Sequence, residues 1–109
     1  MPEYSLKRVK EKIRAQDWRA TPNAENRCWD DFGWGREDMG RCILKLNDKH
    51  HLADQRRNHF YKSEPFEREP HLLLDFYKAH NIMDGESVYI HLYIREEDDK
   101  LIINSFHQL

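Results

Sequence analysis

The spacing of hydrophobic residues follows a helical period in the first half of the chain. Between residues 6 and 13 the apolar positions recur every three or four residues, which predicts an amphipathic helix, and Ser5 precedes them as a helix cap. Thr21 and Pro22 form a second start signal, for a short helix that ends at residue 30 or 31. After a break at residues 33–35, a third helical stripe ends near residue 47; its members are Met39, Cys42, Ile43 and Leu46.

The second half of the chain has the two-residue period of strands. Residues 87–95 alternate aliphatic with aromatic side chains and predict the clearest strand. A polar reversal at residues 96–99 precedes a hairpin partner at residues 100–108. The apolar run at residues 72–77 fits a strand or a buried helix, and we favour a strand, whereas Pro65 and Pro70 bracket a charged loop. These elements predict an α+β protein whose N-terminal helices pack on one face of a small antiparallel sheet.

The predicted strands have two unlike faces, because successive side chains point to opposite sides of a sheet. The aliphatic face of residues 87–95 requires a cover of helices, since each exposed aliphatic side chain would cost roughly 1.5–3 kcal/mol. The other face carries Tyr89, His91 and Tyr93. Strict alternation in the last strand places Ser105 and His107 on one face with Leu101 and Ile103, opposite Ile102, Asn104 and Phe106.

Pairing of these two strands would bring the Tyr89 and His91 face beside Ser105 and His107. Such a face suits RNA, because bases stack on aromatic rings and imidazole titrates near neutral pH. An ordinary exposed sheet face has the same composition, so both interpretations stay open.

The composition describes one small, densely charged domain. The chain has 109 residues, with 18 Lys and Arg against 20 Asp and Glu, so its formal net charge is −2. A protein that binds several phosphates is usually basic, so the net charge argues against RNA binding. The local balance differs, because residues 7–19 are mainly basic and residues 96–99 are purely acidic. The basic helix either flanks a cleft or is simply solvated.

Other features narrow the class of protein. No apolar run reaches the ~18–20 residues that span a membrane, and the first residues lack a signal-peptide core, so we expect a soluble, cytoplasmic protein without membrane contacts. Cys28 and Cys42 are too few for a disulfide scaffold and lack the spacing of a zinc site, so we expect buried thiols. The polar stretch at about residues 48–58 indicates an insertion within a single domain of residues 1–109.

Histidines in this polar stretch raise the alternative of a metal site. On a helix, His50 and Asp54 would share one face, with His51 and His59 nearby. The spacing matches no established zinc motif and lacks a glutamate base. We therefore predict no metal ion and no other cofactor.

Three short motifs resemble one known family. They are FYKS at residues 60–63, VYI at residues 88–90 and LIINSF at residues 101–106. In order and approximate spacing they resemble the MqsR family of bacterial toxins, small mRNA interferases of type II toxin–antitoxin pairs with a RelE-like fold. The resemblance implies a RelE-like fold, mRNA as substrate and a cognate antitoxin as protein partner. It also implies a metal-independent, sequence-selective endoribonuclease that arrests growth.

Matching the family pattern residue by residue implies a partly altered site. Lys62 and Tyr89 occupy catalytic positions of the family, whereas His107 stands in place of a lysine. Leu74 stands in place of a catalytic glutamine, and Glu3 in place of a histidine. The alternative function is therefore a RelE-like module that has lost catalysis and binds RNA, a ribosome or a protein partner.

Cleavage of this kind proceeds by attack of the ribose 2′-OH on the adjacent phosphate and leaves a 2′,3′-cyclic phosphate. It needs a base, an acid and fixed positive charge. We assign His107 as acid or base, because an imidazole titrates nearer neutrality than a lysine, with Lys62 as phosphate clamp and Tyr89 as orienting group. The predicted substrate contacts are Tyr61, His91, Arg95 and Ser105, with His91 as a candidate second titrating group.

Overall fold

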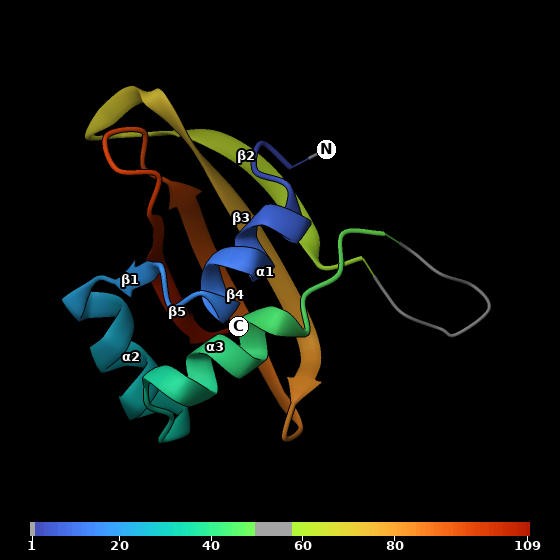
Figure 1. Cartoon of the computed structure of the whole chain (residues 1–109). Coiled ribbons are helices and arrows are strands. Elements are labelled where there is room, and N and C mark those ends of the chain that lie inside the picture. The colour runs from blue at the N-terminus through green and yellow to red at the C-terminus, as the bar shows by residue number, and fades with distance from the viewer. Residues whose placement is uncertain (1, 50–57) are drawn as a thin grey trace.

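Helices cover one face of a five-stranded sheet in the computed structural model, which describes residues 2–49 and 58–109 (Figure 1). In chain order the elements are α1 (Leu6–Arg14), β1 (Trp18–Ala20), α2 (Pro22–Phe32), α3 (Arg36–Leu44), β2 (Phe60–Phe66), β3 (Glu69–Met83), β4 (Glu86–Ile94) and β5 (Leu101–Gln108). The strand order is β1-β5-β4-β3-β2, and only the β1–β5 pair is parallel within this described part. The predicted α+β fold is confirmed and is consistent with a RelE-like architecture.

The helices bury the aliphatic face of β4, as the alternating pattern predicted. Val88, Ile90 and Leu92 are fully buried. They share one core with apolar side chains of α1 and α3, among them Val9, Ile13, Met39 and Ile43. Burial of each such side chain stabilises the fold by about 1.5–3 kcal/mol. The sheet face on the far side from α1 and α3 is left uncovered by the described helices (Figure 1).

The helices begin where their cap residues predicted. The Ser5 hydroxyl accepts a hydrogen bond from the Arg8 amide, and Thr21 Oγ1 accepts one from the Ala24 amide at 3.1 Å. Gly33 ends α2 in the left-handed conformation, with φ of 71°, which a glycine adopts without strain. The third helix ends at Leu44, earlier than expected, because the next two amides bond three residues back instead of four.

Strand β1 was not predicted. Its three residues pair in parallel with the start of β5, with Trp18 opposite Leu101 and Ala20 opposite Ile103. The segment is too short to display a two-residue period, and its partner lies more than 80 residues further along the chain.

The charged loop predicted between Pro65 and Pro70 is only a two-residue turn, at residues 67–68, because both prolines lie in the strands of a long hairpin formed by β2 and β3. Strand β2 is the edge of the sheet, where a missing backbone N–H is tolerated. Pro70 precedes the part of β3 that pairs with β4, which runs from Asp75. The preference for a strand at residues 72–77 is confirmed.

A β-bulge in β5 overturns the strict alternation expected for this strand. Leu92 pairs with Ile103, but the adjacent His91 pairs with Ser105, so Asn104 is an extra residue. Leu101, Ile103 and Phe106 therefore face the core, whereas Ser105 and His107 lie beside the open face of β4; the predicted grouping of Ser105 and His107 with Leu101 and Ile103 is wrong. Thr21 Oγ1 donates to the Asn104 carbonyl at 3.0 Å and holds the bulge.

The residues on either side of the polar stretch proposed as an insertion, Asn47 and His59, are hydrogen-bonded to each other. The Asn47 amide donates to His59 Nδ1 at 3.0 Å, and the His59 amide donates to the Asn47 carbonyl at 2.6 Å. Residues 50–57, which include His50, His51 and Asp54, lie outside the described residues. No described helix has the length and apolar character needed to cross a membrane.

Candidate active site

The uncovered sheet face, here called the open face, presents two cross-strand rows of side chains. The pairing register aligns Lys62, Phe76, His91 and Ser105 in the first row, across β2 to β5. It aligns Lys78, Tyr89 and His107 in the second row, across β3 to β5. Six of the predicted site residues thus gather on this face: Tyr61, Lys62, Tyr89, His91, Ser105 and His107.

The second row joins a phenol, an imidazole and an ammonium group. The rings of Tyr89 and His107 have centroids 5.3 Å apart. Lys78 Nζ lies 3.8 Å from the Tyr61 ring centroid and 6.0 Å from that of Tyr89. Within residues 2–49 and 58–109 this ammonium has no carboxylate at ion-pair distance, so its charge remains available to an anion.

His107 is half-buried, and one of its ring nitrogens is held by the backbone. Its Nδ1 atom lies 2.8 Å from the Gln108 carbonyl oxygen, which only accepts hydrogen bonds, so Nδ1 carries the proton. In the neutral ring, Nε2 is then left with its lone pair. The Gln108 amide in turn donates to Asp31 of α2 at 2.8 Å, which fixes the end of β5.

His91, in the first row, is an uncharged group. It stacks on Phe76, with ring centroids 4.0 Å apart and planes 9° from parallel, and contacts the Tyr89 ring at 4.7 Å. Burial lowers the pKa of His91 to about 4, and the charges of His107 and Lys62 add to this effect. Its Nε2 atom is buried without a hydrogen-bond partner.

Lys62 is a fixed cation at the β2 edge of the first row. Its ammonium donates to Glu64 at 2.7 Å, and this bond raises the pKa of Lys62 above its usual value. The same ammonium lies 5.1 Å from the Phe76 ring centroid. Lys62 therefore stays protonated. A positive charge is what a group that binds phosphate needs, whereas a general base must be unprotonated.

A model of one protein family matches residues 1–108 of the chain; the family is described as "Motility quorum-sensing regulator, toxin of MqsA". The chain belongs to this MqsR toxin family. A comparison with curated protein sequences found no match. The resemblance drawn from the short motifs is confirmed, and the chain is a toxin of the kind that pairs with an antitoxin.

Besides His107, two further positions depart from the MqsR pattern, and they lie differently with respect to the open face. Leu74 is buried on β3, two residues before Phe76 on the same face, and offers no polar group where the family pattern has a glutamine. The Glu3 amide donates a hydrogen bond to the carboxylate of Asp75, whose side chain lies on the core side of β3. The structure therefore does not bring Glu3 into either row.

Three residues that form or support the site were not predicted from the MqsR motifs. Phe76 and Lys78 complete the rows, and their positions two and four residues after Leu74, on the same strand face, were the available signal. Asp75 is fully buried and accepts hydrogen bonds from the Glu3 and Tyr4 amides, at 2.9 and 2.8 Å, and from the Ser63 hydroxyl. This carboxylate fastens the N-terminal segment and the FYKS strand to β3.

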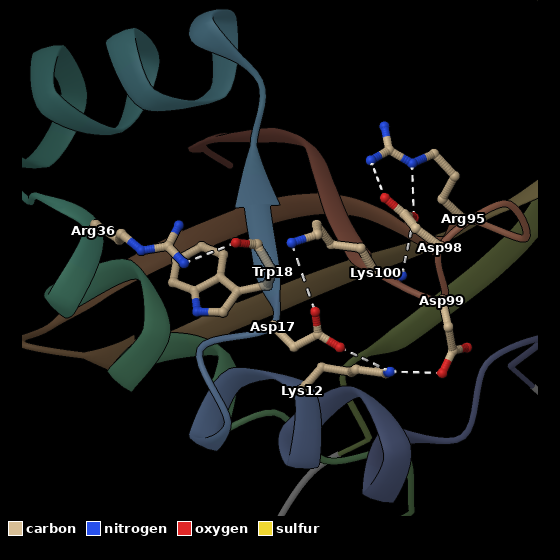
Figure 2. Close-up of polar contacts among 8 residues, drawn as sticks. All are labelled: Lys12, Asp17, Trp18, Arg36, Arg95, Asp98, Asp99 and Lys100. Atoms are coloured by element: carbon tan, nitrogen blue, oxygen red, sulfur yellow. Dashed lines mark hydrogen bonds and ion pairs between the residues drawn. The ribbon is translucent and has the colours of Figure 1, made fainter.

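Arg95 lies outside the two rows of the open face. It follows β4, four residues and therefore about 13 Å from His91 along the strand direction. Its guanidinium is bound by Asp98 through Nε at 3.0 Å and Nη2 at 2.6 Å (Figure 2). With Nε and Nη2 both bound to Asp98, the guanidinium has few N–H groups free to bind a phosphate.

The basic first helix does not flank the open face, because α1 packs on the opposite side of the sheet (Figure 1). Lys12 donates to Asp17 at 3.1 Å and to Asp99 at 2.7 Å (Figure 2). The acidic reversal after β4 thus neutralises part of the basic helix. Lys78, by contrast, has no carboxylate at ion-pair distance in the described part of the chain, so it is a local cation although the net charge is near zero.

The described residues offer no metal centre. Over residues 2–49 and 58–109 there is no group of three or more His, Cys, Asp or Glu side chains arranged to hold an ion. His59 uses Nδ1 to accept the Asn47 amide. The two cysteines are free and buried, as predicted, and burial raises the pKa of each thiol to about 12.

Proposed function

We propose that this toxin is a sequence-selective endoribonuclease that cleaves mRNA without a metal ion. The observation that carries the proposal is the placement of Tyr89 and His107 side by side on the open face, with the ammonium group of Lys78 nearby and that of Lys62 over Phe76 in the neighbouring row. Together these groups meet the three needs of 2′-OH attack: a base, an acid and positive charge at the phosphate.

In the proposed reaction, His107 acts first as a base. Nε2 takes the proton of the ribose 2′-OH, and the 2′ oxygen forms a bond to the adjacent phosphorus. The bond from phosphorus to the 5′ oxygen breaks, and the Tyr89 hydroxyl gives its proton to that oxygen. The protonated His107 then returns a proton to Tyr89. The products are a 2′,3′-cyclic phosphate and a 5′-hydroxyl end.

The remaining residues of the open face hold the substrate. Lys62 and Lys78 offset the negative charge that grows on the phosphate oxygens in the transition state. Tyr61 offers an aromatic surface for a base at the β2 edge, and Ser105 offers a hydroxyl on β5, opposite His91. His91 is a positioning residue, because its lowered pKa leaves it unable to donate a proton at neutral pH. Arg95 has no role in the proposed reaction, because its guanidinium is paired with Asp98.

The proposal is tested by incubating a long RNA of mixed sequence with the purified protein in excess EDTA. We expect fragments with 2′,3′-cyclic phosphate and 5′-hydroxyl ends, and no cut where a single 2′-deoxynucleotide replaces the attacked ribose. His107→Ala should lower the rate by about 10²–10⁴-fold. His71→Ala is the matched control, because His71 is exposed on β3 away from both rows. Intact RNA at high protein concentration would overturn the proposal.

Leu74 supports a second candidate, a module that binds RNA and no longer cuts it. The side chain is buried and apolar where the MqsR pattern has a catalytic glutamine, and Glu64 already neutralises Lys62. This candidate predicts bound but intact RNA in the same assay. Growth on expression separates the two as well, since an active nuclease arrests growth unless its antitoxin is co-expressed.

A further inference from the structure

A hollow of about 410 Å³ adjoins the first row of the open face. Its floor is formed by Phe76, His91 and Ser105, and its wall by the end of β2, at Pro65 and Phe66. Phe66 is held in place by an edge-to-face contact with Tyr93, with ring centroids 6.2 Å apart. The volume is within the roughly 300–1,000 Å³ range of small-ligand sites.

Unused hydrogen-bonding groups converge on this hollow. The bulge in β5 places the Asn104 side chain beside Ser105, and both residues line the cavity. In the described part of the chain, neither the side-chain amide of Asn104 nor the hydroxyl of Ser105 has a hydrogen-bond partner. His91 Nε2 is also buried and unpartnered.

The lining combines flat apolar surface with a short polar edge. The stacked rings of Phe76 and His91, together with Pro65 and Phe66, suit a planar aromatic group. The rim carries Glu64 and Glu67 as well as Arg68, so it lacks the positive excess that a phosphate would require. A flat ring with donors and acceptors on its edge is the chemistry of a nucleobase.

We propose that this hollow binds one nucleobase of the RNA, next to the phosphate that is cleaved, and thereby selects the cleavage sequence. The inference rests on the proposed nuclease function for its link to cleavage. His91 joins the two regions, since its ring stacks on Phe76 in the hollow and makes a T-shaped contact with the Tyr89 ring. A base in the hollow would therefore set the position of the adjoining phosphate near Tyr89 and His107.

The first test maps cleavage sites in a random RNA pool by sequencing the new 5′-hydroxyl ends. Wild-type protein should prefer one base at one position beside the cut, and Asn104→Ala should reduce that preference about tenfold, the effect of losing one hydrogen bond. The substitution keeps the backbone carbonyl that Thr21 contacts, so the bulge is retained. Asn23→Ala, at an exposed position of α2, is the matched control. An unchanged base preference in a folded Asn104→Ala variant would overturn the inference.

The second test does not depend on cleavage. The four nucleoside 5′-monophosphates and ribose 5-phosphate are each titrated into the His107→Ala protein while its amide resonances are followed by NMR. One nucleotide should move the Asn104 side-chain amide and the Ser105 backbone amide more than the others, and ribose 5-phosphate should move neither. Such shifts without RNA cleavage by wild-type protein would refute the nuclease but keep the base site. Equal shifts with ribose 5-phosphate, or none at all, would refute the base site.

Discussion

Tyr89 and His107 are directly opposed residues of β4 and β5, and their ring centroids lie 5.3 Å apart. Their separation is thus set by backbone pairing in the middle of a sheet and not by a mobile loop. The same pairing places Lys78 on the other side of Tyr89. Substitutions in this row should change chemistry while leaving the fold intact, which makes the predictions for it easy to interpret.

The identity of the group at position 107 should set the pH dependence of cleavage. If His107 is the base, His107→Lys should move the rising limb of the pH–rate profile to higher pH, because lysine ordinarily titrates near 10.4 and histidine near 6.5. His107→Gln should remove the limb. The measurement is single-turnover cleavage from pH 5 to 10. An identical limb in wild type and His107→Lys would assign the titration to another group.

Lys78 should contribute to RNA binding through its charge. We expect Lys78→Ala to weaken binding of an uncleavable 2′-O-methyl RNA and to reduce the slope of log K against log salt by about 0.7, the value for one phosphate contact on a single strand. Lys7→Ala is the control, since Lys7 is exposed on α1, on the other side of the sheet. Equal slopes in wild type and Lys78→Ala would exclude a phosphate contact.

Asp75 should be a major source of stability. Asp75→Ala leaves the Glu3 and Tyr4 amides and the Ser63 hydroxyl without their acceptor, which should lower the free energy of unfolding by about 2–4 kcal/mol. Urea unfolding measures the loss. Asp30→Asn, at an exposed position of α2, should cost almost nothing. A similar small loss for Asp75→Ala would mean that these donors find other partners.

The turn after β4 should lose stability in acid. The hydrogen bond from Arg95 lowers the pKa of Asp98 to about 2, from an ordinary value of 3.8. A carboxyl group with a lowered folded-state pKa stabilises the fold above its unfolded value and loses this effect as pH falls through the folded value. Asp98→Asn should therefore lower the urea midpoint at pH 6, and its difference from wild type should shrink between pH 4 and pH 2. Glu96→Gln serves as control.

The two thiols should be unreactive in the folded protein. Burial raises the pKa of Cys28 and Cys42 to about 12, so almost no thiolate is present at pH 8. We expect a disulfide reagent to modify both cysteines rapidly in guanidinium and very slowly under native conditions. Rapid modification of the native protein would show that the core around α2 and α3 opens readily.

Local signals in the sequence were sufficient for most elements of the fold. Ser5, Thr21 and Gly33 mark helix ends through side-chain or backbone preferences that depend only on neighbouring residues. The alternation in β4 likewise reports a strand with one buried face. Strand β1 escaped detection because its pairing with β5 is a long-range contact, and three residues carry no periodic signal.

The composition of the site was predicted better than its geometry. Short motifs pointed to Lys62 and Tyr89, and the open face of β4 to His91. The bulge at Asn104 could not be foreseen, because it depends on the Thr21 hydroxyl that reaches its carbonyl from the start of α2. Asp75 and Lys78 were missed for a related reason, since their roles depend on neighbours from other strands and from the N-terminal segment.

The bulge makes the end of β5 tolerant of the loss of one residue. Because Asn104 is the extra residue, its deletion would let Ser105 follow Ile103 with regular alternation, and Ser105, Phe106 and His107 would keep their present faces. Phe106 would stay packed against Phe32 and Trp34. A codon lost at this point would therefore spare both the imidazole of His107 and the core, and would remove only the Asn104 side chain from the hollow.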